Sequence, residues 1–175
     1  RTAIEIATLA PSVHNSQPWK FVVVRQKNAE LAKVAYGANY DQIMEAPVTI
    51  ALFTDTDLQR RARKIARVGG VKNFTDEQLQ YFMQNLPAEF ARYDAQQTSD
   101  YLALNAGLVA MNLVLALTDQ GIGTNIILGF DKSKVNEVLD IEERFRPELL
   151  ITVGYAAEKV EPSYRLPVDE IIEKR

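Results

Sequence analysis

The chain has 175 residues, of which 47% are hydrophobic and 25% charged, with a net charge of −3 and a pI near 5.3. This composition is ordinary for a single soluble domain with a substantial core, so we expect one domain over residues 1–175. The mildly acidic balance gives no electrostatic footprint for nucleic acid or an anionic membrane. With no cysteine and one histidine, disulfides, thiolate chemistry and iron–sulfur clusters are excluded, and a zinc site is disfavoured. No signal peptide is visible, so we expect a cytoplasmic location.

Hydrophobic patterning predicts alternating helices and strands in the first third of the chain. Residues 2–10 have a helical pattern, and the β-branched run at 20–25 predicts a strand. A second helix is expected over 28–36, with Asn28 as its N-cap. Residues 47–54 are a continuous apolar run, which is typical of a strand buried on both faces.

The stretch 56–100 is richer in charge than its surroundings. Its basic side chains near the start are Arg60, Arg61, Arg63, Lys64 and Arg67. They indicate either the solvated face of an amphipathic helix or a cover over an active site, whose arginines would meet a nicotinamide dinucleotide phosphate. Further along, Thr75 and Gln78 fit a capping box that opens a helix toward Asn85.

Residues 101–117 predict a helix that is apolar nearly all round and must therefore be buried on every side. The run is a little short for a membrane span and carries Asn105 and Asn112. The domain itself can cover such a helix, and a homodimer interface can do so more easily; both interpretations stay open. Residues 149–155 predict the last strand, and the tail from 161 is polar with a short helical end.

The densest polar segment is residues 10–19, which read Ala-Pro-Ser-Val-His-Asn-Ser-Gln-Pro-Trp. Two prolines stiffen this backbone between the first helix and the first strand. Five side chains supply hydrogen-bond donors and acceptors: Ser12, His14, Asn15, Ser16 and Gln17. The segment suits a polar, planar ligand, or else it is a helix stop whose turn residues satisfy local backbone groups.

Other chemistries leave no motif in the sequence. There is no Gly-x-Ser-x-Gly, no metal-binding histidine pair and no Walker A sequence. Gly121 and Gly123 follow a long helix and are too far from Gly129 for a dinucleotide-binding fingerprint. Any NAD(P)H would thus bind without a Rossmann site. We name no catalytic side chain and no metal ligand.

Three segments carry a family resemblance. They read Ala10-Pro11-Ser12-x-x-Asn15-x-Gln17-Pro18-Trp19 before a valine-rich strand, Asn105-Ala-Gly107 through Gly121-Ile-Gly123-Thr124, and Pro147 through Gly154-Tyr155 followed by Tyr164-Arg165-Leu-Pro167. In order and spacing they resemble the nitroreductase family, the FMN-dependent NAD(P)H oxidoreductases, over nearly the whole chain.

The resemblance implies an α+β fold in which helices flank a mixed β-sheet, and an intertwined homodimer. It implies FMN as cofactor and NAD(P)H as co-substrate, with ping-pong reduction of a small-molecule acceptor: a nitroaromatic, a quinone or a flavin. Two alternatives remain. One is a flavin-binding module for storage, sensing or flavin breakdown without efficient turnover; the other is a hydrolase that uses Ser12.

The resemblance also implies where the cofactor binds. The loop would line the flavin ring and ribityl chain across the dimer, the segment after Gly121 would donate backbone N–H groups to the ring, and an arginine would meet the phosphate. The residues are Pro11, Ser12, Asn15, Gln17, Thr124, Asn125, Ile126, Gly129 and Arg165. Since the chain starts inside a helical pattern, we expect an upstream segment; in the family it carries an arginine-rich motif that grips the flavin phosphate.

Overall fold

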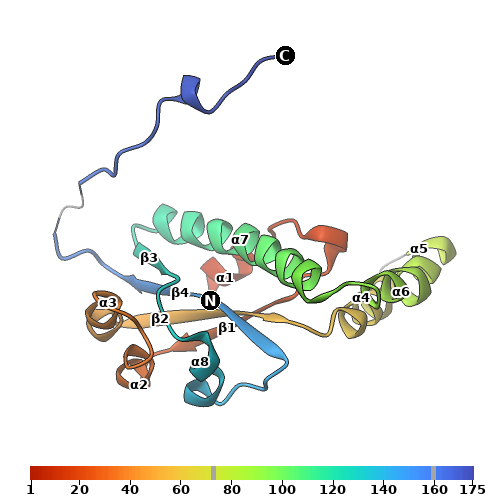
Figure 1. The fold of residues 1–175 in the computed structure, drawn as a ribbon, viewed down its shortest axis with the longest axis horizontal. Coiled ribbons are helices and arrows are strands. Elements are labelled where there is room, and N and C mark those ends of the chain that lie inside the picture. Colours follow the sequence, from red (N-terminus) through yellow and green to blue (C-terminus); the bar gives the residue numbers. More distant parts are fainter. Residues whose placement is uncertain (72–73, 159–160) are drawn as a thin grey trace.

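A computed structural model of the chain describes residues 1–71, 74–158 and 161–175. Four strands form one antiparallel sheet in the order β1-β2-β4-β3, and helices pack on it (Figure 1). The strands are β1 Trp19–Val24, β2 Val48–Asp55, β3 Gly123–Ile127 and β4 Phe145–Gly154. The longest two, β2 and β4, are central, so β1 and β3 form the edges.

In the described parts of the chain, eight α-helices connect and cover the strands. They are α1 Thr2–Ala7, α2 Asn28–Ala32, α3 Asn39–Glu45, α4 Leu58–Val71, α5 Asp76–Gln80, α6 Leu86–Phe90, α7 Ala95–Asp119 and α8 Lys132–Leu139. Short turns lie at Val13–Asn15, Tyr81–Asn85 and Val168–Glu170. The tail after β4 leaves the sheet, and residues 161–175 are exposed (Figure 1).

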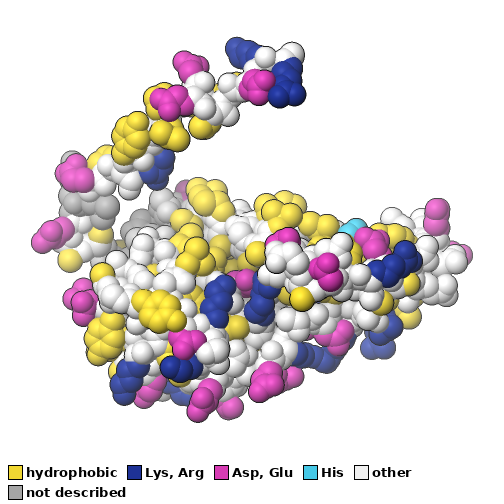
Figure 2. All heavy atoms as spheres, in the orientation of Figure 1, with side chains coloured by type: hydrophobic (Ala, Val, Ile, Leu, Met, Phe, Trp, Pro, Cys, Tyr) yellow, Lys and Arg dark blue, Asp and Glu magenta, His cyan; other side chains and the backbone are white. Residues whose placement is uncertain are grey.

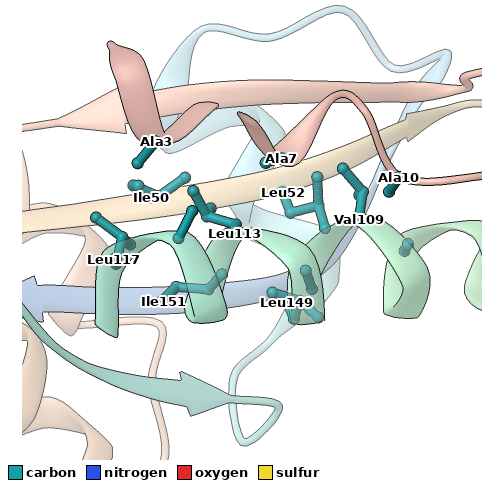
Figure 3. Packing of buried hydrophobic residues seen from close by; sticks show 13 residues of the cluster. Ala3, Ala7, Ala10, Ile50, Leu52, Val109, Leu113, Leu117, Leu149 and Ile151 are labelled. Carbon is teal, nitrogen blue, oxygen red and sulfur yellow. The ribbon is translucent and has the colours of Figure 1, made fainter. Parts of the chain in front are cut away.

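Strand β2 is buried on both faces, as its unbroken apolar run predicts. Successive side chains point to opposite sides of a sheet. Ile50 and Leu52 pack with α1 and α7 (Figure 3), whereas Ala51 and Phe53 pack in a second cluster with residues of α2, α3 and α8. All four are at most 5% exposed. The molecule therefore has three layers, with the sheet between two helical layers.

The α+β class is confirmed, but the directions of the strands differ from the expected mixed sheet. All three pairings in the described part of the chain, β1 with β2, β2 with β4 and β4 with β3, are antiparallel. A continuous apolar strand indicates burial on both faces, and helices on both sides produce that burial in an antiparallel sheet as well. The pattern therefore predicts the burial of β2 and not its direction.

The expected helix over 28–36 is wrong in its length and in its cap. Helix α2 ends at Ala32, and a separate helix α3 begins at Asn39 after Gly37 adopts a left-handed conformation with φ of 56°. Asn28 does not cap α2; its Nδ2 donates to the backbone oxygen of Ala46, 2.8 Å away. The side chain thus ties the start of α2 to the end of α3.

The segment after β2 forms α4, α5, a π-turn and α6. The capping box at Thr75 is confirmed, because Thr75 Oγ1 accepts from Gln78 N and the Gln78 side chain accepts from Thr75 N. The helical path continues beyond the expected end at Asn85 through the π-turn into α6, which carries Pro87 in its first turn. Three further elements, α3, β3 and α8, have no counterpart in the sequence patterns.

Helix α7 has 25 residues, longer than expected, and begins at a capping box between Asp94 and Gln97. It is long and apolar enough to cross a membrane, with a mean hydropathy of 1.7 over 18 residues. Half of those residues are buried, however, and the core helix of a soluble protein can have the same length and composition. One side packs on the sheet. The other side exposes Leu104, Met111 and Leu115, each at least 50% accessible. The chain alone therefore does not bury this helix all round.

We expect Leu113→Ala to lower the free energy of unfolding by about 2–5 kcal/mol, because Leu113 is fully buried between α7 and the sheet (Figure 3) and its truncation leaves a cavity. Urea denaturation measures the change. The matched control is Leu9→Ala at a side chain that is 80% exposed, with an expected effect within about 0.5 kcal/mol. Equal effects of the two substitutions would contradict the described core.

Candidate functional site

The polar loop, residues 11–18, has an unusual backbone. Three of its non-glycine residues are left-handed: His14 with φ of 54°, Asn15 with 49° and Gln17 with 44°. A non-glycine residue in this region costs on the order of 1–3 kcal/mol and persists only where the surroundings enforce it. Residues held in this way are typical of ligand-binding segments, so the loop is the first candidate for a site.

The side chains of the loop hold one another. Ser12 Oγ accepts from Gln17 N at 3.1 Å, and Gln17 Nε2 donates to Asn15 Oδ1 at 3.0 Å. These contacts match the expectation that turn residues satisfy local groups. They also leave the Ser12 hydroxyl proton and Asn15 Nδ2 without a partner among the described residues, and Asn15 is exposed. The loop can therefore present two polar groups from a fixed backbone.

Helix α7 fastens the loop to the body. Asn105 is fully buried; its Oδ1 accepts from Val13 N at 2.8 Å and its Nδ2 donates to Tyr101 O at 2.7 Å. The Tyr101 hydroxyl donates to Val13 O at 2.7 Å and lies 2.8 Å from Ser16 Oγ. Burial raises the pKa of Tyr101 to about 12. The polar residues of the apolar helix thus serve as anchors for the loop.

His14 lies in an aromatic cluster. Its ring centroid is 5.8 Å from that of Phe90, 6.2 Å from Tyr101 and 6.4 Å from Tyr81. Its Nδ1 is buried and has no hydrogen-bond partner among the described residues. Phe90 and Tyr81 belong to the segment 56–100, so this segment packs directly on the polar loop.

The second group of candidate residues lies on β3. Thr124 is partly buried, while Asn125 and Ile126 are exposed. Since β3 is an edge strand, only alternate residues turn their N–H groups away from β4. The N–H groups of Thr124 and Ile126 therefore point to one side of the strand and the N–H group of Asn125 points to the other.

Sequence reasoning missed two residues of α3 that support this strand. Asn125 Nδ2 donates to Gln42 Oε1 at 2.7 Å, and Asn39 Nδ2 donates to Gly129 O at 3.0 Å. Gln42, Thr124 and Asn125 line one pocket of 680 Å³ beside the end of β4. The sequence pattern predicts one helix over 28–36 and no helix at α3, so it does not indicate Asn39 or Gln42.

Gly129 has a structural explanation. Its carbonyl accepts from Tyr36 N at 2.8 Å and from Asn39, and a Cβ at this position would lie 2.4 Å from Asn39 Nδ2. The glycine therefore permits the close approach of α3 to the end of β3.

The structure does not bring the two groups together within one chain. The polar loop contacts the first half of α7, whereas β3 begins after its last residue. Asn105 and Asp119 are separated by about 21 Å of helix at 1.5 Å per residue. Arg165 lies on the exposed tail, where its described hydrogen bond goes to its neighbour Tyr164. Ser12, Asn125 and Arg165 are thus distributed over three separate places.

Between the loop and α7 lies an apolar groove of 550 Å³. It is lined by Ala10, Pro11, Ala103, Leu104, Gly107, Leu108, Met111, Asn112 and Leu115. Hydrophobic side chains gather over α7 in Figure 2 and recur along the tail. Among the described residues no group of three or more His, Cys, Asp or Glu could hold a metal ion. The polar groups of the loop therefore lie at the edge of an apolar surface on α7.

We expect Tyr101→Phe to destabilise the protein by about 1 kcal/mol at pH 7, because Val13 O loses its donor. A tyrosine ionises near pH 10 when unfolded, but the folded Tyr101 keeps its proton to about pH 12. Unfolding of the wild type therefore releases a proton in this window, and its stability falls with rising pH by up to about 1.4 kcal/mol per unit.

Tyr101→Phe has no hydroxyl to ionise at this position, so its stability does not fall in this way. The difference in unfolding free energy between the two proteins should therefore narrow above pH 10. Urea unfolding at pH 7, 9 and 10.5 measures it. A difference that stays constant across these pH values would contradict the buried, proton-retaining hydroxyl.

Known proteins resemble this chain over its whole length. The model of the nitroreductase family matches residues 1–155. Spy0809 of Streptococcus pyogenes serotype M6 is 65% identical over 175 residues, which are 100% of this chain and 87% of the relative. Its name assigns it provisionally to the NAD(P)H nitroreductases.

Two solved structures share the fold. A nitroreductase family protein from Streptococcus pneumoniae TIGR4 has a TM-score of 0.96 and 86% identity, over 100% of this chain and 88% of that one. A protein from Exiguobacterium sibiricum 255-15 is provisionally named a nitroreductase and was solved in complex with FMN. It has a TM-score of 0.89 and 29% identity, over 99% of this chain and 84% of that one. The expected nitroreductase-like fold is thus confirmed, and the chain belongs to the nitroreductase family.

Proposed function

We propose that this protein is an FMN-dependent oxidoreductase that passes reducing equivalents from NAD(P)H to a small-molecule acceptor. The observation that carries the proposal is the polar loop, whose left-handed backbone holds Ser12 and Asn15 ready for a ligand. A family relative with the same fold was solved in complex with FMN, which supports this choice of ligand. Nitroaromatics, quinones and flavins are the acceptor classes that we propose.

The residues of the chain fit a flavin. The Ser12 hydroxyl and Asn15 Nδ2 can donate to the polar edge of the ring or to the ribityl chain, and Pro11 offers an apolar surface beside them. Gln17 acts through Asn15, to which its side chain donates. The free N–H groups along β3 can serve ring nitrogen and oxygen atoms. Arg165 can meet the phosphate with a fork of donors once the tail lies against a partner.

Bound FMN would supply the two-electron chemistry, so the protein has to bind the cofactor, orient its ring and shield it from water. The loop and β3 orient the ring, and the segment 56–100 covers the site and limits access of water. The sequence has no dinucleotide fingerprint of its own. We therefore propose that NAD(P)H and the acceptor occupy the same place in turn, which gives ping-pong kinetics.

We also propose that the working form is a homodimer built on α7. Its exposed side carries Leu104, Met111 and Leu115, and an added Cβ at Gly107 would meet nothing in the chain, so this side is free for close approach. With the two-fold axis perpendicular to α7, the second copy runs its α7 antiparallel to the first. The polar loop of one subunit then comes beside β3 of the other, which completes a site that neither chain holds alone.

The test of function is an anaerobic titration of the purified protein with NADH and NADPH. We expect a yellow protein whose absorbance near 450 nm, roughly the flavin maximum, is bleached by a nicotinamide and recovers on adding a quinone or nitroaromatic. A yellow protein that neither nicotinamide bleaches would favour the alternative, a flavin-binding module. A colourless protein that takes up no FMN would refute both.

The dimer is tested with Met111→Glu at the centre of the exposed side of α7. A buried, unpaired carboxylate should separate the subunits, and a shared site should then lose FMN. We expect sedimentation to show a dimer for the wild type and a monomer without flavin for Met111→Glu. Val71→Glu, at a side chain that is 85% exposed on α4, is the control and should keep both properties. A flavin-loaded monomer would contradict a shared site.

A further inference from the structure

The end of the polar loop is held by consecutive carbonyl groups. Arg61 Nε donates to Ser16 O at 3.2 Å, and Arg61 Nη2 donates to Gln17 O. The next carbonyl, of Pro18, accepts from Asp55 N at 2.7 Å. Three successive loop carbonyls thus accept hydrogen bonds from the end of β2 and the first turns of α4. Neighbouring turns of α4 carry other basic residues, but among the described residues Arg61 is the one whose side chain donates to the loop.

The surroundings of Arg61 fit a structural contact rather than a solvated charge. Its side chain is partly buried, and burial lowers the pKa of the guanidinium while the Asp55 carboxylate opposes that shift. Asp55 is 3% exposed; burial raises the pKa of its carboxyl, against the Asp57 N–H and the Arg61 charge. A cation moved out of water needs hydrogen-bond partners. Here these partners are the loop carbonyls.

The loop needs this second attachment. Tyr101 and Asn105 hold its entrance, at Val13, and Tyr101 also lies against the Ser16 hydroxyl. Gln17 is left-handed, and its carbonyl is held by Arg61. The side chain of Gln17 in turn donates to Asn15, one of the proposed flavin contacts. A continuous path of hydrogen bonds therefore runs from Arg61 through Gln17 to Asn15.

We propose that Arg61 is a positioning residue for the flavin loop: its guanidinium ties the Ser16 and Gln17 carbonyls to α4 and so fixes the direction of the Asn15 amide. This inference rests on the proposed use of FMN. It also gives one member of the basic cluster a role different from a dinucleotide phosphate contact. Because α4 opens the segment 56–100, the loop and its cover are joined on two sides, through Arg61 and through the ring of His14.

The experiment compares Arg61→Met with Arg60→Met. Both variants remove one positive charge from the same helix and from the same pocket of 220 Å³. Among the described residues, Arg60 makes a hydrogen bond through its backbone N–H, to Asp57, and not through its side chain. The dissociation constants of FMN and riboflavin are measured by fluorescence quenching, and the visible circular dichroism of the bound flavin reports the surroundings of the ring.

We expect Arg61→Met to weaken FMN and riboflavin alike, by about tenfold to hundredfold, because the hydrogen bonds of a charged group are lost and the loop contacts the ring and ribityl chain. The circular dichroism of bound flavin should change as well. Arg60→Met should stay within about twofold of the wild type for both ligands. Arg61→Lys, which can serve one carbonyl, should bind with intermediate affinity.

Wild-type affinity and an unchanged flavin spectrum in Arg61→Met would overturn the proposal. So would equal losses in Arg60→Met and Arg61→Met, or a loss confined to FMN, since both would indicate a charge effect on the phosphate. If Arg61→Met does not fold, Arg61→Lys decides, and wild-type behaviour there counts against positioning. A wild-type protein that binds neither flavin would refute the proposed function itself, and this inference with it.

Discussion

The structure depends on the two-sided character of α7. One side buries leucine, valine and alanine against the sheet, and within that apolar side Tyr101 and Asn105 keep their polar groups satisfied by bonding to the polar loop. A buried amide or hydroxyl without a partner would cost on the order of 1–3 kcal/mol. The loop conformation and the helix packing therefore support each other. The hydrogen bonds to Tyr101 and Asn105 offset the conformational cost of the left-handed loop residues, and the same hydrogen bonds satisfy the buried polar groups of the helix.

This mutual support explains why the proposed site sits on a loop and is still well defined. The entrance of the loop bonds to α7 and its exit bonds to β2 and α4, so its conformation is set by elements far apart in the sequence. His14 adds an apolar attachment to the segment 56–100 through Phe90 and Tyr81. A site fixed from both ends can bind without first ordering its own backbone, which lowers the entropic cost of binding.

Much of this could be predicted from the sequence, and the misses share a cause. The burial of β2, the helix α7 and the cap at Thr75 follow from periodicity and local chemistry, which act over a few residues. The break between α2 and α3 depends on Gly37, whose left-handed conformation no pattern prescribes. The inward turn of Arg61 depends on carbonyls some 45 residues earlier in the chain. Such contacts exist only once the layers have assembled.

The distance between the polar loop and β3 along α7 has a genetic consequence. In the proposed dimer each chain gives its loop to one site and its β3 to the other. A chain defective in its loop and a chain defective at β3 would then restore one intact site when they pair, while their second site combines both defects. Two individually inactive alleles of such a protein would complement each other within a single mixed dimer, up to half the activity of the normal one.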